Sequence, residues 1–591
     1  MPAQAPNSLL PRKKPNILWW VLGIFFVLLV LFVLQIFGPN PRIIISPQTT
    51  HIAGPLTPDG LPDYERYYRE RATDGVTPEN NAATLLWPAL WPGELQPSQY
   101  AAVAAELGLA KVPSVADALV RVHHKSVQNN IADWLREQDA ARAAARSDAD
   151  PAAKKPLSTS DNYGVDPYFE LAMPLIDQAI GRPWKTDDIP PLAKWVADNQ
   201  KPLDTLVEAT RRPRFYMPSP SLIDNERGMM IAVLLPGIQS CREVARGLPA
   251  RAMWHLGEGR PMDAWEDLHA VHRLSRLISQ DGQTVVEQLV AIAISGVACE
   301  STHTLLHHGN LTPEQARKIQ QDLAALGSFG NMARSIGQWE RIMGLDSIVH
   351  ISRSGGNALN DMIGHDTGPM VQSLRVVSID WNLVLREANR RYDQLAEAAI
   401  APTWLERQAA LAAVDAELNR LSSSLQSPQR WLGAALTREQ RSRLVADVTM
   451  ALLLPAINAA HAAQDRGNIN LAVVQLAAAL AVYRAENGSY PEMLDALVPA
   501  VLPALPVDLF HGKPYIYRRD GEGYLLYSVG ANGADDGGSS QRQRVYDGRS
   551  TDDMTDAERD QILPQIPNGS DDHAIRVPRR MFELPKTPIS Q

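Results

Sequence analysis

The residues best suited to chemistry lie between Tyr527 and Gly538, where the chain reads YSVGANGADDGG. Asn532, Asp535 and Asp536 supply hard oxygen atoms, and the glycines allow backbone carbonyl groups to turn inward. Such a loop could hold a metal ion, cradle a phosphate or form a plain turn. A phosphate site needs free N–H groups and a nearby cation, and two adjacent carboxylates would repel the phosphate. Calcium, which takes about 6–8 oxygen ligands in irregular geometry, and a plain turn remain open.

A second group of candidate ligands occupies one face of an expected helix. His303 and His307 are four residues apart, and Glu300 precedes them by one turn. These residue types bind zinc, but the zinc-peptidase pattern H-E-x-x-H is absent because Thr304 stands at the glutamate position. Two interpretations are open: the metal site of a hydrolase, and an amphipathic helix end with partly exposed histidines. The second is the more common use of such a pattern.

Other sequence features narrow the function. The formal net charge of −9 and the lack of a concentrated basic face argue against a nucleic-acid partner. Neither the G-x-S-x-G nucleophile elbow nor the G-x-x-x-x-G-K-[ST] phosphate loop occurs in the sequence. Cys241 and Cys299 are the two cysteines, and both lie in apolar helical contexts. A disulfide and two buried thiols are both open.

The N-terminal region contains a long apolar helix, Ile17–Phe37, without a charged residue. A helix of this length spans about 30 Å, the thickness of the hydrocarbon core of a bilayer. A secretory signal peptide has an apolar region of only about 7–15 residues and an A-x-A cleavage pattern, so we expect an uncleaved transmembrane anchor. The basic residues Arg12, Lys13 and Lys14 place residues 1–16 in the cytoplasm and the chain after the anchor outside it.

The rest of the chain is expected to be mainly helical. Its other apolar segments are shorter than the first, so we expect a single-pass protein. Residues 38–62 are rich in proline, glycine and threonine, which is typical of a stalk. Residues 63–440 contain helix-capping patterns such as Thr312–Gln315 and predict a helical extracytoplasmic body. We expect a mobile loop at about 140–160, where large apolar residues are few.

Strand patterns concentrate near the C-terminus. Tyr515–Arg519 and Tyr524–Val529 flank a short glycine turn and predict an antiparallel β-hairpin. Together with the helix before it, the hairpin predicts a small α+β module over residues 441–545, and residues 546–591 are expected to form a polar tail. The expected fold class is therefore mainly α with a small α+β module.

Three stretches near the C-terminus follow one another in a recognisable order. Gln475–Pro491 is a helix pattern that ends in a Tyr…Asn-Gly…Tyr-Pro turn, Leu505–Tyr515 begins Leu-Pro-Val-Asp, and Tyr527–Gly533 reads YSVGANG. In this order they resemble the pilin-like and pseudopilin proteins of bacteria, including the pilin-like proteins of planctomycetes. The third stretch is similar to the loop that binds calcium in the major pseudopilin of type II secretion.

The resemblance carries expectations about the site. It implies that residues 441–545 form a pseudopilin-like module and that Asn532, Asp535 and Asp536 are side-chain ligands of Ca²⁺. Asn532 replaces an aspartate of the family, which removes one negative charge and predicts weaker calcium binding.

The segment Trp195–Pro218 also resembles membrane-anchored envelope proteins of planctomycetes. Those proteins have no established activity, so the resemblance implies no function. The anchor and the charges before it predict a location in the bacterial inner (cytoplasmic) membrane, with Ile17–Phe37 in the bilayer and the C-terminal region extracytoplasmic. We expect a non-enzymatic scaffold that interacts with other envelope proteins and carries a calcium-stabilised pseudopilin-like module. The alternative is an extracytoplasmic metal-dependent hydrolase with its site in the helical body.

Overall fold

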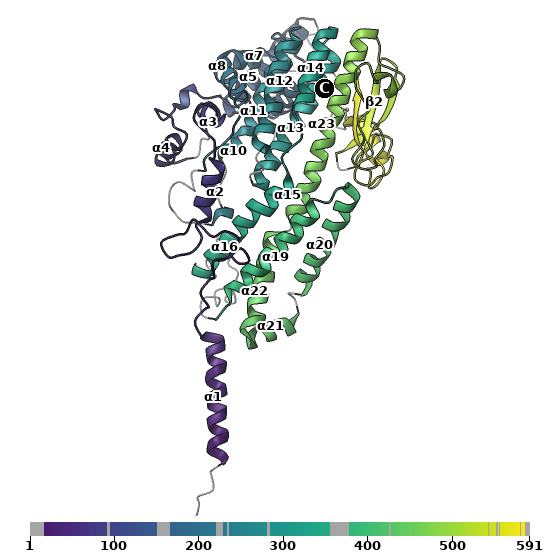
Figure 1. Cartoon of the computed structure of the whole chain (residues 1–591). Helices are drawn as coiled ribbons and strands as arrows, with labels where there is room; N and C mark the ends of the chain where they lie inside the picture. The colour runs from purple at the N-terminus through teal and green to yellow at the C-terminus, as the bar shows by residue number, and fades with distance from the viewer. Residues whose placement is uncertain are drawn as a thin grey trace, which may run out of the picture. The chain divides into compact units, whose positions relative to one another are not determined.

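Helices dominate this computed structural model of the chain, and a small group of strands lies near its C-terminus (Figure 1). The expectation of a mainly helical chain with a small antiparallel sheet is therefore confirmed. The structure describes residues 17–91, 95–149, 166–219, 229–232, 236–280, 284–354, 377–424, 427–454, 456–541, 543–550, 554, 556–578 and 581–584.

The chain divides into two compact units, each assembled from segments that are far apart in sequence. Unit 1 comprises Met1–Asp63, Met343–Arg391 and Ala416–Leu454, and unit 2 comprises Tyr64–Ile342, Tyr392–Asp415 and Pro455–Gln591. The helical body expected over residues 63–440 contributes to both units, and the expected C-terminal module shares unit 2 with many of the body helices. Segments that are neighbours in sequence are thus not always neighbours in the fold.

Unit 1 contains the N-terminal apolar helix and a group of long helices. Its helical segments come from α1 (Ile17–Phe37), α16 (Arg341–Ser354), α19 (Trp381–Ala399), α20 (Trp404–Ser424), α21 (Pro428–Leu436) and α22 (Arg438–Leu453). The segment expected to be a stalk is fixed to α19 by side-chain amides. The Asn382 side chain accepts a hydrogen bond from Ile44 N (2.8 Å) and donates one to Arg42 O (2.9 Å), and Asn389 Nδ2 donates to Thr49 O (2.8 Å).

Three helices of the described chain are long and apolar enough to cross a membrane: α1, α13 (Val285–His308) and α23 (Ala456–Asn487). They differ in their surroundings. The most apolar window of α1 is 0% buried, whereas the windows in α13 and α23 are 67% and 61% buried inside the fold. The helices α13 and α23 pack against each other within unit 2, so their apolar surfaces serve the protein core.

Unit 2 is a helical assembly in which α12, α13 and α23 are central. Its helices are α2 (Tyr64–Ala72), α3 (Ala83–Leu90), α4 (Pro97–Glu106), α5 (Lys125–Ala149), α6 (Pro167–Gly181), α7 (Pro190–Asp198), α8 (Gln200–Ala209), α10 (Pro236–Ser240), α11 (Val244–Gly257), α12 (Pro261–Ser279), α13, α14 (Pro313–Ala325), α15 (Met332–Arg334), α23 and α24 (Asp556–Ile562), with parts of α19 and α20. The expected loop at 140–160 falls partly in α5, which continues to Ala149, and its remainder lies outside the described residues.

A three-stranded antiparallel sheet packs beside α23, and its strands are yellow in Figure 1. The expected hairpin is formed by β1 (Ile516–Asp520) and β2 (Gly523–Ser528), with Tyr517 opposite Leu526. The third strand, β5 (His573–Val577), pairs with the other edge of β2 and lies in the segment expected to be a polar tail. A two-residue ribbon, β3 (Val545–Tyr546) with β4 (Arg549–Ser550), precedes it.

The sheet and the helices of unit 2 share one hydrophobic core. The rings of Tyr490 and Tyr524 meet edge to face at 4.8 Å, and the Tyr517 hydroxyl donates to Pro491 O at 2.6 Å. All side chains of β2 are buried, as a central strand with both faces covered requires. The hydrophobic cluster that contains Tyr524 and Leu526 also contains residues of α12 and α13, so the C-terminal module does not have a separate core.

Candidate functional site

A cavity of about 630 Å³ opens among α7, α8, α11 and α12 of unit 2, and we call it the α8–α12 groove. Its charged lining residues are Asp204, Glu208, Arg211, Arg251, Arg260, Asp263, Glu266 and Asp267. Most of these side chains belong to α8, α11 and α12. Within one helix, residues three and four positions apart lie on the same face, so several of them can point into one cavity. Asp204 and Glu208 follow this spacing on α8, and Asp263, Glu266 and Asp267 follow it on α12.

A tight turn between α11 and α12 brings their faces together. Gly259 adopts a φ of 75°, in the left-handed region that favours glycine. Gly257 has Trp184 O only 1.9 Å from the place where a Cβ atom would sit, so a larger residue would displace the backbone there. Pro261 then starts α12 at the first helical position, where its missing N–H is harmless. The turn therefore fixes how the acidic face of α12 meets α11.

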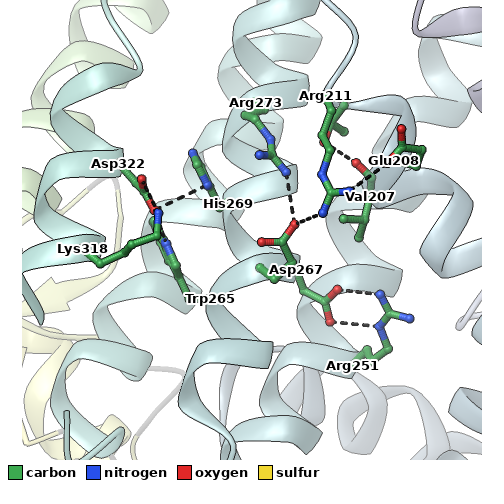
Figure 2. A network of polar contacts seen from close by, with 12 residues as sticks. Val207, Glu208, Arg211, Arg251, Trp265, Asp267, His269, Arg273, Lys318 and Asp322 are labelled. Atoms are coloured by element: carbon green, nitrogen blue, oxygen red, sulfur yellow. Dashed lines mark hydrogen bonds and ion pairs between the residues drawn. The ribbon is translucent and has the colours of Figure 1, made fainter. Parts of the chain in front are cut away.

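A buried ion pair joins α11 and α12 at the groove (Figure 2). Arg251 donates from Nε to Asp267 Oδ2 at 2.9 Å and from Nη2 to Asp267 Oδ1 at 2.6 Å. Its Nη1 donates to Asp204 Oδ1 at 2.6 Å. The Asp267 side chain is 3% exposed, and burial raises its pKa to about 6 although Arg251 opposes the shift. This two-bond geometry is the strong form of an ion pair, so it holds α8, α11 and α12 in register.

A second, more exposed set of ion pairs lies beside the first. Arg211, just after α8, donates to Glu208 Oε2 at 2.8 Å and to Glu266 Oε1 at 2.6 Å. Arg273 Nη2 lies 3.6 Å from the same Glu266 oxygen. Figure 2 shows Arg211 between Glu208 and the residues of α12. Each arginine of this region therefore contacts at least one carboxylate.

The wall formed by α11 contributes an aromatic ring and a neutral imidazole. The Arg260 guanidinium lies over the Trp254 ring, 4.6 Å from its centroid, and Trp254 Nε1 donates to Thr186 Oγ1 at 3.0 Å. Burial, helped by Arg260 and Arg251, lowers the pKa of His255 to about 4. His255 is thus uncharged near neutral pH. Its Nε2 lies 3.9 Å from Asp267 Oδ2, which is too far for a hydrogen bond.

The other side of α12 carries a polar cluster that also appears in Figure 2. Asp322 of α14 accepts hydrogen bonds from Trp265 Nε1 (2.8 Å) and from Lys318 Nζ (2.8 Å), and His269 Nδ1 lies 3.8 Å away. The His269 and Trp265 rings are stacked 5.1 Å apart. These contacts tie α14 to α12 and stabilise the helix that supplies one wall of the groove.

The groove offers carboxylates, guanidinium groups and one imidazole. Among its described lining residues there is no serine, threonine, cysteine or tyrosine to act as a nucleophile. Five carboxylates and three guanidinium groups line the groove, and His255 adds no charge. Arg273 lies outside the lining but pairs with Glu266 at 3.6 Å, so one negative charge remains in excess. Neither the groove nor its residues were found from the sequence. The one pattern that could have indicated the groove is the spacing of the acidic residues on α12. The residues that face them belong to α8 and α11, which the spacing on α12 does not predict.

The loop after β2 brings the three expected calcium ligands together. Asp535 Oδ1 accepts hydrogen bonds from the Tyr527 hydroxyl (2.9 Å) and from Gly537 N (3.0 Å). Asn532 Nδ2 donates to Asp536 Oδ2 at 2.7 Å, and Asn532 Oδ1 accepts from Ala534 N at 2.9 Å. Each of these side chains therefore uses one oxygen to shape the loop itself. Over the described part of the chain, no group of three or more His, Cys, Asp or Glu side chains with metal-site geometry occurs.

A fourth polar residue of this loop region, Asp572, was missed in the sequence. Asp572 Oδ2 accepts hydrogen bonds from Asp536 N (3.0 Å) and Gly538 N (2.8 Å). Its Oδ1 is buried and has no hydrogen-bond partner among the described residues. Burial raises the pKa of Asp572 to about 7, and the nearby Asp536 and Asp535 add to the shift. Asp572 therefore lies close enough to Asp535 and Asp536 to add to the repulsion among the carboxylates of this loop.

The histidines of α13 do not form a site in the described structure. Glu300 is exposed, whereas His303 is buried. The His307 ring contacts the His308 ring edge to face at 4.6 Å, and burial lowers the pKa of His307 to about 4. They therefore give the hydrolase alternative no support.

Both cysteines are buried free thiols, so no disulfide joins them. Comparisons of the chain with protein-family models, with curated proteins and with solved structures give no match.

Proposed function

We propose that the chain is a membrane-anchored binding protein, held in the bilayer by α1 and free of catalytic activity. The observation that carries the proposal is the exposure of α1. Its apolar side chains from Trp20 onward are largely uncovered, with Phe25 and Phe26 63% and 64% exposed. Leaving a large apolar side chain in water costs about 1.5–3 kcal/mol relative to burying it. A bilayer removes this cost along the whole helix.

The charges around α1 support an orientation. Arg12, Lys13 and Lys14 precede the helix, and such residues favour the cytoplasmic side. The chain after Phe37 would then be extracytoplasmic, in the inner membrane of a bacterium. The burial of α13 and α23 supports a single pass, because most of their apolar surface packs in the core of unit 2 and is not available to a bilayer.

A binding role fits the α8–α12 groove. The groove combines a rigid floor, the Arg251–Asp267 pair, with exposed carboxylates at its rim. Its described lining residues include no serine, threonine, cysteine or tyrosine. The proposal is thus a scaffold that captures other components of the cell envelope rather than one that transforms them.

We also propose that Ca²⁺ stabilises the pseudopilin-like module. The support is the donor chemistry of the loop: Asp535 and Asp536, named by the resemblance, and the buried Asp572, which carries an oxygen without a partner among the described residues. Asn532 would act mainly by holding Asp536 in place, because its amide donates to that carboxylate. Bound calcium would supply positive charge that offsets the repulsion among these carboxylates.

Membrane fractionation tests the anchor. The full chain should stay with the membrane pellet after an alkaline carbonate wash, and a variant that lacks Ile17–Phe37 should be soluble. A matched variant, Val27→Arg/Leu31→Arg, keeps the length of the helix and places two charges in it, each of which costs about 2.5–3.5 kcal/mol at the centre of a membrane helix. Release of the unaltered chain by the wash, or retention of the deletion variant, would contradict the proposal.

A further inference from the structure

We propose that the α8–α12 groove binds an organic polycation, recognising several alkylammonium or guanidinium groups carried on one flexible chain. The ligand is either a polyamine or a basic peptide segment, since both present this chemistry. The inference deepens the proposed binding role by naming the class of ligand. It concerns unit 2 alone, so it can fail while the membrane anchor is correct, and the reverse also holds.

The size and continuity of the groove fit a chain-like ligand. Its volume of about 630 Å³ lies within the range of about 300–1,000 Å³ typical of small-molecule sites. A second cavity of about 640 Å³ shares Ala197, Gln200, Asp204 and Glu208 with the first. The two cavities therefore adjoin at α8, where the second is also lined by Asp198 and Lys201. An extended ligand bound in the first cavity can reach the second.

The rim offers hydrogen-bond acceptors that the protein leaves unused. Asp204, Glu208, Asp263 and Glu266 each give one oxygen to an arginine. No described residue makes a hydrogen bond or ion pair within contact distance to the other oxygen of any of these four carboxylates. Their side chains are between 46% and 59% exposed, so a ligand can reach them.

The arginines of the groove are already paired with carboxylates, which disfavours an anionic ligand. Arg251 uses all three of its nitrogens on Asp267 and Asp204. Arg211 uses both terminal nitrogens on carboxylates, and Arg260 lies between Asp263 and the Trp254 ring. An anion would have to displace one of these contacts and would meet an excess of negative charge, because five carboxylates face three lining arginines and Arg273. A cation meets free acceptors and neutralises that excess.

Apolar side chains complete the match. Val196, Ala197 and Val207 line the same groove. The methylene stems of lysine, arginine or a polyamine pack well on such a surface while their charged ends stay in polar surroundings. The groove thus offers carboxylates for the charged groups of a polycation and aliphatic side chains for its methylene groups.

The test removes charge from the rim without touching the buried pair. Glu208→Gln/Asp263→Asn changes two exposed carboxylates to amides of the same shape. Glu70→Gln/Asp133→Asn removes the same charge from exposed residues that lie outside the groove. Calorimetric titration of the full chain in detergent would use spermidine, an acetylated Lys-Arg-Lys amide and, as an anionic counterpart, citrate.

We expect at least one cationic probe to bind the unaltered chain and the rim variant to bind it at least about tenfold more weakly, as the loss of two nearby charges implies. The control variant should change affinity less than twofold. Tighter binding of spermidine identifies a polyamine as the source, and tighter binding of the tripeptide identifies a basic protein segment. Citrate binding more tightly than both cations, equal affinities of the rim variant and the unaltered chain, or no cation binding at millimolar concentration would overturn the proposal.

Discussion

Asp572 accepts a hydrogen bond from the backbone N–H of Asp536 at 3.0 Å and buries its other carboxylate oxygen with no described partner. The contact joins the loop after β2 to the segment that leads into β5, across residues that are far apart in sequence. A buried anion without compensation destabilises a fold. The stability of this part of unit 2 should therefore depend on what neutralises Asp572.

Calcium should raise the melting temperature of the full chain in detergent. An ion that binds only the folded state stabilises it by about 2.7 kcal/mol at a concentration 100 times its dissociation constant. The rise should disappear in Asp535→Asn/Asp536→Asn and persist in Asp495→Asn, which changes an exposed carboxylate outside the loop. An unchanged melting temperature at millimolar calcium would show that the loop is a plain turn.

With chelator present, the unaltered chain should lose stability relative to Asp572→Asn as pH rises, whatever the net pH dependence of the fold. The pKa of Asp572 is about 7 in the folded chain, above the ordinary value of 3.8. The folded state thus holds this proton more tightly than the unfolded state does, so the contribution is present at low pH and is lost as pH rises from about 4 through about 7. Thermal melts at pH 5 and pH 8 measure it. An identical pH dependence in the variant would show that Asp572 does not titrate in this way.

The buried ion pair of the groove should be far more sensitive than an exposed one. Asp267→Ala leaves the Arg251 guanidinium buried with only Asp204 as a partner, and such a loss costs about 3 kcal/mol. Lys194→Gln breaks the exposed pair with Asp198 and should cost less than about 1 kcal/mol. Urea unfolding followed by tryptophan fluorescence compares them. Similar midpoints for the two variants would mean that the pair does not hold the helices together.

Two glycines of the loop after β2 should respond differently to alanine. Gly530 and Gly533 have φ values of 69° and 67°, so each substitution introduces backbone strain of about 1–2 kcal/mol. At Gly530 the new Cβ would also lie 1.9 Å from Asp571 O, whereas nothing lies within 4 Å at Gly533. Gly530→Ala should therefore lower the melting temperature clearly more than Gly533→Ala. Equal effects would contradict the packing of the loop against Asp571.

The parts of the fold that the sequence predicts are those with a local pattern. The β1–β2 hairpin follows from two strand patterns around a glycine turn, and α1 follows from an uninterrupted apolar run. Strand β5 was not predicted from the sequence, because its five residues include His573 and Arg576 and its partner strand lies about 50 residues earlier. Buried and partly buried residues alternate along β5, but an alternation of only five residues is too short to be recognised in a polar stretch of sequence.

The same distinction between local and non-local contacts decides which parts of the candidate sites are predictable from the sequence. Asn532, Asp535 and Asp536 are adjacent in sequence, so their proximity is predictable, while Asp572 joins them only through the pairing of β2 with β5. The groove depends on Arg251 of α11 meeting Asp267 of α12 and an acid of α8. Helix periodicity predicts which side chains share a face, but not which faces meet.

The most direct test of the proposed membrane-anchored protein is the sidedness of unit 2 in intact cells. Cys241 and Cys299 are buried, and burial raises the pKa of their thiols to about 12 and about 11, so they should resist a membrane-impermeant maleimide. A single new thiol, Glu70→Cys on the exposed surface of α2, then reports location. We predict labelling in intact spheroplasts to the same extent as after lysis. Labelling that requires lysis would place unit 2 in the cytoplasm and contradict the account.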